Sequence, residues 1–219
     1  MVFALAISPD GKFLATGGSS NEHPENNLEL WEMPTGKPRG LLNGHTHAVF
    51  SLAFSADSSI LASGSMDSTV KLWDPLTPTV KQTLTGQPPG GGVPRLAFSP
   101  QGTLLAIAGD SAVQLFDMAS GTSRKIATSF GYSLAFSPDG KTVAVGSRNM
   151  AGPGEIELLD VASGTLKRKL AGSQGVVASL VFSPDGKLLA SGGAVYKVDA
   201  QGQSNMEVEA GAINLWPLE

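Results

Sequence analysis

Residues 44–74 read GHTHAVFSLAFSADSSILASGSMDSTVKLWD, and this stretch decides the fold. It contains three short runs of apolar, β-branched and aromatic residues, at 49–54, 60–64 and 70–73, and turn-forming residues separate them. Runs of this length and composition predict β-strands. Because a fourth and more polar run follows at 80–84, the stretch predicts one unit of four antiparallel strands.

The same unit recurs five times along the chain. Each copy has a Ser-Pro-Asp-Gly turn, or a variant of it, after its first strand, and the turn serines are Ser8, Ser55, Ser99, Ser137 and Ser183. The third strand of each copy ends at Trp31, Trp73, Phe116, Leu159 or Trp216. A period of about 40–45 residues predicts a supersecondary unit stacked on copies of itself. We therefore expect one domain over 1–219, with repeats at approximately 1–42, 43–86, 87–128, 129–172 and 173–219.

The turn sequence has a clear physical basis. Proline fixes φ at the first corner, and glycine takes the positive φ that closes the hairpin. Three copies keep the whole turn, at Ser8–Gly11, Ser137–Gly140 and Ser183–Gly186, whereas the third copy has Gln101 in place of aspartate. The first and second strands of each copy are nearly all apolar, so we expect both of their faces to be buried.

The pattern resembles the WD40 repeat family of β-propellers. The resemblance rests on Gly44-His45 and Trp73-Asp74 at the two ends of the second copy, with Ser63 and Asp67 between them. It covers essentially the whole chain, and it implies an all-β propeller of about five four-stranded antiparallel blades.

The resemblance also implies a hydrogen-bonded tetrad inside a blade. In the second copy its members are His45, Ser63, Asp67 and Trp73. The other copies are incomplete: the first keeps Thr16 and Trp31, and the fifth keeps Ser191 and Trp216. We expect apolar packing to replace the tetrad in most blades.

The last copy ends after its third strand, and the first lacks a counterpart of Gly44–His47. Three architectures agree with the incomplete first and last copies: a closed five-blade ring with one three-stranded blade, a piece of a larger ring, or an open arc completed by another chain. Closing a propeller hides its strand edges. We favour the second or the third, because the resemblance is to a family in which five-bladed members are uncommon. Either self-association or completion by another chain would supply the missing strand.

Composition excludes several classes of partner. The chain has 219 residues and a formal net charge of −4, so it carries no general attraction for polyanions, and we expect no nucleic-acid partner. No stretch approaches the roughly 20 apolar residues that cross a bilayer, so we expect no membrane partner. Met1–Ile7 lacks a basic start and runs into the first turn, so it predicts a strand rather than a signal peptide. The absence of cysteine fits a cytoplasmic location.

No pattern for catalysis or for a cofactor stands out. The three histidines are not grouped with carboxylates at metal-ligand spacing. Gly36-Lys37 is followed by proline and lacks the upstream glycine of a phosphate-binding loop. We therefore expect no catalytic residues, no metal, no cofactor and no enzymatic activity.

Insertions between the second and third strands indicate the working face. They occur at 19–27, 148–155 and 194–210, and the last of these predicts a hairpin extension. Insertions on one face of a repeat protein often mark its binding surface. The candidate partner-binding residues in them are His23, Arg148, Tyr196 and Met206. Because the insertions are mainly acidic, they favour a basic or neutral peptide.

These observations predict a non-catalytic scaffold that binds a protein or peptide on its loop-rich face. The alternative is a regulatory or sensor propeller segment of a larger multidomain enzyme, such as a kinase.

Overall fold

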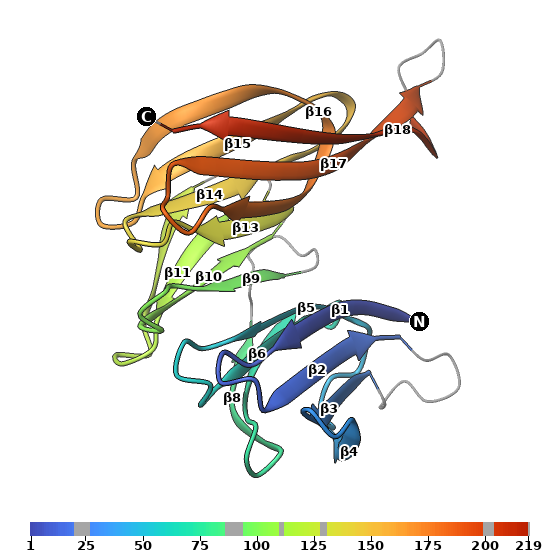
Figure 1. Ribbon diagram of the computed structural model, residues 1–219, viewed down its shortest axis with the longest axis vertical. Helices are drawn as coiled ribbons and strands as arrows, with labels where there is room; N and C mark the ends of the chain where they lie inside the picture. The colour runs from blue at the N-terminus through green and yellow to red at the C-terminus, as the bar shows by residue number, and fades with distance from the viewer. Residues whose placement is uncertain (20–26, 86–93, 110–111, 128–130, 199–203, 219) are drawn as a thin grey trace.

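The computed structural model describes residues 1–19, 27–85, 94–109, 112–127, 131–198 and 204–218. In these ranges the chain is all β and contains no helix. Its strands form antiparallel sheets that follow one another as the blades of an arc (Figure 1). The predicted propeller of five blades, the last with three strands, is confirmed.

The first three blades are separate four-stranded sheets whose strands pair in chain order. Blade 1 comprises β1 (Val2–Ile7), β2 (Phe13–Gly18), β3 (Leu28–Glu32) and β4 (Lys37–Leu41). Blade 2 comprises β5 (Val49–Phe54), β6 (Leu61–Ser65), β7 (Thr69–Asp74) and β8 (Thr79–Thr85). Blade 3 comprises β9 (Arg95–Phe98), β10 (Leu104–Ala108), β11 (Val113–Asp117) and β12 (Ser123–Ala127).

Blades 4 and 5 share one six-stranded sheet. Its strands are β13 (Ser133–Phe136), β14 (Thr142–Gly146), β15 (Arg148–Asp160), β16 (Leu166–Phe182), β17 (Leu188–Val198) and β18 (Ser204–Pro217). Strand β16 is the outer strand of blade 4 and then the inner strand of blade 5, and Val176 pairs with both Arg148 of β15 and Ala194 of β17.

The expectation of a loop insertion at 148–155 is wrong. These residues belong to β15, because Arg148 and residues 153–155 pair with β16 between Ala171 and Val176. The hairpin expected in the fifth copy is confirmed by the pairs Tyr196–Val208 and Val198–Ser204. In Figure 1 this hairpin projects beyond the rest of blade 5.

The hydrophobic core lies between the blades. Four clusters of buried side chains join blades 1 and 2, 2 and 3, 3 and 4, and 4 and 5. Adjacent residues of a third strand serve different interfaces: Trp73 packs toward blade 1, whereas Leu72 packs toward blade 3. This is the strand alternation that places successive side chains on opposite faces.

The outward faces of blades 1 and 5 are not covered by another blade. One position of each third strand carries a leucine on the side that faces the next blade. This leucine is buried in the first four blades, at Leu30, Leu72, Leu115 and Leu158. Its counterpart in blade 5, Leu215, is 66% exposed. On the other side, Leu5 of β1 is 65% exposed, while its counterpart Leu96 is 8% exposed. The expectation that both faces of every first strand are buried is therefore wrong for β1 and for the first strand of blade 5, where Val181 of β16 is 59% exposed, because no blade of this chain packs against these faces.

The Ser-Pro-Asp-Gly turns share one hydrogen-bond pattern. In each turn that keeps its aspartate, the serine Oγ donates to a carboxylate Oδ1 at 2.6 Å, as in Ser8 to Asp10. The glycines take φ near +70°, and Ser58 of the variant turn takes the same conformation at 62°. The hydrogen bond from Ser8, together with the backbone N–H of Lys12, lowers the pKa of Asp10 to about 2.

We expect acid to destabilise the protein through these turns. A folded-state pKa below the unfolded value means that the stabilisation is present above the unfolded pKa and disappears as the pH falls through the folded one. The melting temperature should therefore fall between about pH 4 and pH 2, the window between the usual aspartate pKa and that of Asp10. Thermal unfolding followed by circular dichroism measures this.

Two variants assign the effect to the turns. Asp10→Asn should make the fall with pH shallower, and Gln101→Asp, which restores the carboxylate to the third turn, should make it steeper. Identical pH profiles for wild type and Asp10→Asn would contradict the assignment.

Candidate functional site

Four side chains of blade 2 form a buried hydrogen-bonded chain. The Trp73 Nε1–H donates to Ser63 Oγ at 2.7 Å, and Ser63 Oγ lies 2.7 Å from His45 Nε2. His45 Nδ1 lies 2.8 Å from Asp67 Oδ2. The structure thus brings together the four residues that the resemblance groups as a tetrad. They connect the segment before β5 with β6, β7 and the turn between them.

The direction of the hydrogen bonds follows from the protonation states. Burial lowers the pKa of His45, although the hydrogen bond and charge of Asp67 oppose the shift, so the imidazole is neutral near pH 7. Because a carboxylate only accepts, we assign the imidazole proton to Nδ1, which leaves Nε2 to accept the Ser63 hydroxyl. Burial raises the pKa of Asp67, but hydrogen bonds from Thr69 and His45 outweigh it and leave this pKa below its usual value.

This Ser-His-Asp chain has the connectivity of a hydrolase triad but lacks its access. Ser63 is 0% exposed, and its oxygen accepts the indole N–H of Trp73. A catalytic nucleophile must reach the carbon of a bound substrate. The arrangement is therefore suited to holding the strands of blade 2 together.

Partial versions of the tetrad occur in the two end blades. Trp31 Nε1 donates to Thr16 Oγ1 at 3.2 Å in blade 1, and Trp216 Nε1 donates to Ser191 Oγ at 2.9 Å in blade 5. Blade 4 has apolar Val145 and Leu159 at these positions, and both are buried. Apolar packing therefore takes the place of the hydrogen bond there.

The structure describes the candidate partner-binding residues to different extents. Arg148 is exposed at the start of β15, and its guanidinium lies 5.5 Å from the centroid of the Tyr132 ring. Tyr196 and Met206 lie on β17 and β18, where the structure describes their backbone but not their side chains. His23 lies outside the described residues. Arg148 pairs with Val176 of β16, and Val176 pairs with Ala194 of β17, so Arg148 lies two strands away from the base of the hairpin.

A further group of side chains, which sequence reasoning missed, lines a cavity of about 270 Å³ at the inner edges of blades 2 to 5. Arg95, the first residue of β9, donates from Nη1 to the Phe50 carbonyl oxygen at 3.1 Å. Its guanidinium also lies over the Tyr132 ring, 4.5 Å from the centroid. Phe50 stacks on Phe3 of β1, with ring centroids 4.3 Å apart.

A signal for Arg95 was present in the sequence. Four residues before the turn serine, the other copies have small side chains, namely Ala4, Ser51, Ser133 and Ser179. The third copy has Arg95 at this position. A long cation in a column of small residues is the kind of exception that marks a functional position in a repeat protein.

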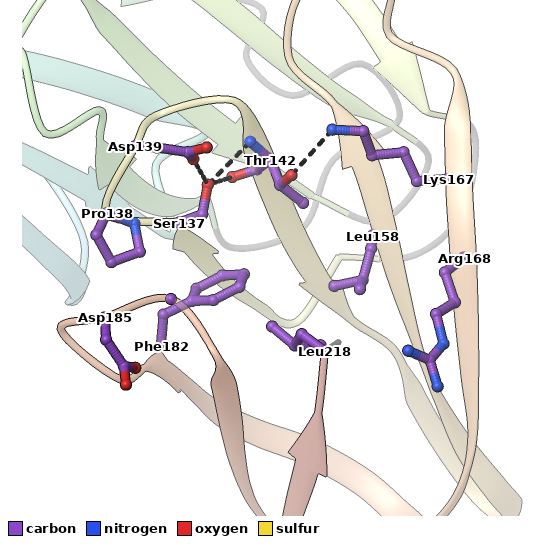
Figure 2. Close-up of a pocket in the computed structure, with 11 residues that line it drawn as sticks. Ser137, Pro138, Asp139, Thr142, Leu158, Lys167, Arg168, Phe182, Asp185 and Leu218 are labelled. Carbon is purple, nitrogen blue, oxygen red and sulfur yellow. Dashed lines mark hydrogen bonds between the residues drawn. The ribbon is translucent and has the colours of Figure 1, made fainter.

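A second pocket, of about 450 Å³, lies between blades 4 and 5, beside their Ser-Pro-Asp-Gly turns. Figure 2 shows Leu158, Phe182 and Leu218 together in it, with Lys167 and Arg168 along one side. Lys167 is paired with Asp160 at 3.1 Å and contacts Thr142 Oγ1 at 3.2 Å. Because its polar groups are engaged within the fold and its turn recurs in other blades, this pocket gives little indication of a ligand.

The described residues also bear on metal binding and on membrane insertion. Among them, no group of three or more histidine, cysteine, aspartate or glutamate side chains is arranged to hold a metal ion. They also include no helix of the length and apolar character needed to cross a membrane.

The blades, their turns and the tetrad define a β-propeller built from repeats. The family model described as WD domain, G-beta repeat matches residues 1–22, 36–74, 78–117, 127–150 and 164–194. These segments cover more than half of the chain, which therefore belongs to the WD40 repeat family.

The chain is also similar in sequence to individual proteins and similar in fold to a solved structure. The chain is 35% identical over 128 residues to human transducin beta-like protein 2, covering 51% of this chain and 28% of that protein. It is 35% identical over 116 residues to the target of rapamycin complex subunit wat1 of Schizosaccharomyces pombe, covering 52% of this chain and 34% of that protein. The chain thus spans only part of the length of these relatives. Hydrazine synthase of Kuenenia stuttgartiensis superposes with a TM-score of 0.82 over 100% of this chain and 63% of its own, and at 19% identity this likeness shows the fold alone.

Replacement of Trp73 tests the stabilising role of the tetrad. Trp73→Ala should lower the free energy of unfolding by about 3–5 kcal/mol, because it removes a buried aromatic ring and leaves Ser63 without its donor. Trp73→Phe keeps part of the ring and should cost less, about 2–3 kcal/mol, because it leaves a smaller cavity and still removes the donor to Ser63. Urea denaturation measures both changes. A loss below about 1 kcal/mol for Trp73→Ala would contradict the argument.

Proposed function

We propose that this WD40 propeller is a non-catalytic scaffold that binds a protein or peptide partner on the face carrying the second-to-third-strand connections. One observation carries the proposal: the extended hairpin of β17 and β18, Arg148 and the Arg95–Tyr132 pair all lie toward this end of the strands. The strands thus present the exposed Arg148 and the half-buried Arg95 and Tyr132 on a face whose connections vary in length from blade to blade, as binding surfaces often do.

Two kinds of supporting evidence agree with this proposal. The relatives include a protein described as a complex subunit, and the family membership gives a fold that is widely used for protein contacts. The tetrad, whose serine is inaccessible, supports a structural rather than a chemical role for the polar residues of blade 2. We further propose that the protein acts in the cytoplasm, on the basis of its lack of cysteine.

A matched pair of charge reversals in blade 4 tests the binding face. Arg148→Glu changes a residue at the proposed face, and Lys141→Glu makes the same change of charge at the Ser-Pro-Asp-Gly turn, the opposite end of the blade. A partner isolated by crosslinking from cells that express the protein should bind Arg148→Glu at least tenfold more weakly than wild type. Lys141→Glu should bind as wild type does. Surface plasmon resonance measures both, and equal losses for the two variants would contradict the proposed face.

We also propose that the uncovered faces of blades 1 and 5 bind each other between copies of this chain. Every interface within the arc joins the leucine side of one blade to the tryptophan side of the next. Blade 5 leaves a leucine side uncovered, with Ile213 at 83% and Leu215 at 66% exposure, and blade 1 leaves the complementary side. Exposed apolar patches of this kind mark association surfaces.

Sedimentation in the analytical ultracentrifuge tests the self-association. At micromolar concentration the wild type should show species heavier than one 22.5 kDa chain. Leu215→Lys should shift the distribution toward the single chain without lowering its thermal stability, because this side chain is already exposed. A wild type that sediments as one chain at every concentration would contradict the proposal.

A further inference from the structure

The cavity at the inner edges of the blades has a distinctive electrostatic character. Among the described residues that line it, Arg95 is the charged one. A guanidinium stays protonated at any physiological pH and offers five N–H donors. The described residues provide one acceptor for them, the Phe50 carbonyl oxygen at 3.1 Å. The described part of the chain therefore leaves Arg95 without a carboxylate partner.

Two serine hydroxyls add donors to the same cavity. Ser51 Oγ accepts the backbone N–H of Leu96 at 3.0 Å, so within the described part of the chain its own hydrogen remains to be donated. Ser179, on β16, is exposed and also lines the cavity. Ser133, in contrast, donates to the Val177 carbonyl oxygen at 2.8 Å and is used within the fold. Donors from three blades thus face one space, which is the arrangement that favours an anion.

The surroundings of Arg95 hold it in place. Its guanidinium lies over the Tyr132 ring of the next blade, and its Nη1 is anchored on the preceding blade. A cation fixed in this way by stacking and hydrogen bonding loses little side-chain freedom when a ligand binds. Its position on the first residue of a strand, rather than in a loop, makes it a rigid part of the face.

The size of the cavity restricts the ligand. At about 270 Å³ it lies just below the usual range of small-molecule sites, about 300–1,000 Å³, so it suits one polar side chain rather than a complete ligand. The stacked rings of Phe3 and Phe50 lie beside the Arg95 anchor and offer an apolar surface for the residues next to that side chain.

We propose that this cavity receives the anionic group, carboxylate or phosphate, of one side chain in an extended partner peptide. The inference deepens the proposed function, on which it rests, by naming the chemistry of the partner. It also reverses the preference for a basic or neutral peptide that the acidic insertions suggested. That preference came from Glu22, Glu25, Asp199, Glu207 and Glu209, whose side chains the structure does not describe, whereas Arg95 is a described part of the framework.

A selection from a phage-displayed library of random dodecapeptides tests the proposal. Peptides selected by the wild-type protein should be enriched in aspartate or glutamate at one position. In fluorescence polarisation, a synthetic peptide of the selected sequence should bind Arg95→Gln at least tenfold more weakly. Its affinity for the wild type should fall as the salt concentration rises, because the contact is between charges. Arg95→Lys should bind with intermediate affinity.

Arg168→Gln is the matched control. It removes the same charge, together with a guanidinium-to-carbonyl hydrogen bond to Pro217 at 3.4 Å, on the outer part of β16. Its affinity for the peptide should equal that of the wild type, and the melting temperatures of both glutamine variants should confirm that they are folded. Versions of the peptide with glutamate, phosphoserine or glutamine at the enriched position distinguish the sources of the anion: glutamate, phosphoserine or both should exceed glutamine.

The outcomes separate this inference from the proposed function. Selected peptides without acidic enrichment, or with equal affinity for wild type and Arg95→Gln, would overturn the anion site. If such peptides still lost affinity for Arg148→Glu, the binding face would stand. A selection that yields no binding peptide would overturn the anion site, and the partner isolated from cells would then test the face by itself.

Discussion

Every blade of this protein depends on apolar contact with its neighbours, because a four-stranded sheet has two apolar faces and cannot bury either one alone. The alternation along a strand sends Leu72 to one interface and Trp73 to the other, so one strand contributes to two interfaces at once. Burial of a leucine side chain stabilises by about 1.5–3 kcal/mol relative to exposure, and each interface contains several such residues. Stability therefore accumulates from neighbour to neighbour along the arc, as in other repeat architectures.

The same constraint explains why the tetrad is complete in a single blade. A buried serine, histidine and aspartate are tolerable only if each hydrogen-bonding group finds a partner, and blade 2 meets that condition through Trp73 and Thr69. Removing one member leaves an unsatisfied group, whereas replacing several members by apolar residues of suitable size costs little. Val145 and Leu159 in blade 4 represent the second solution. Blades 1 and 5 show a third solution, in which the tryptophan and its hydroxyl partner remain and satisfy each other.

Much of the fold could be predicted from the sequence, because its signals are local. Turn residues and short apolar runs gave the strands, and the interval between turn serines gave the number of blades. The continuous strand β16 was missed because it depends on pairing between residues 148–155 and 171–176, to which glycine and polar residues contribute mainly their backbone. The exposure of β1 was missed for a different reason: Leu5 resembles Leu96 in sequence, and only the absence of a preceding blade in the arc distinguishes them.

Arg95 illustrates how a repeat fold produces a site from a single exceptional residue. The inner strands bring the same sequence position of successive blades to one cavity, so small residues at Ser51, Ser133 and Ser179 create space that one long side chain can occupy. The charge of Arg95 is therefore surrounded by small side chains that the other inner strands carry at the same position. Its field is concentrated at one point of the face, because Arg95 is the first residue of β9. Specificity for the charge of a ligand is therefore better determined by the inner strand than by the net charge of −4.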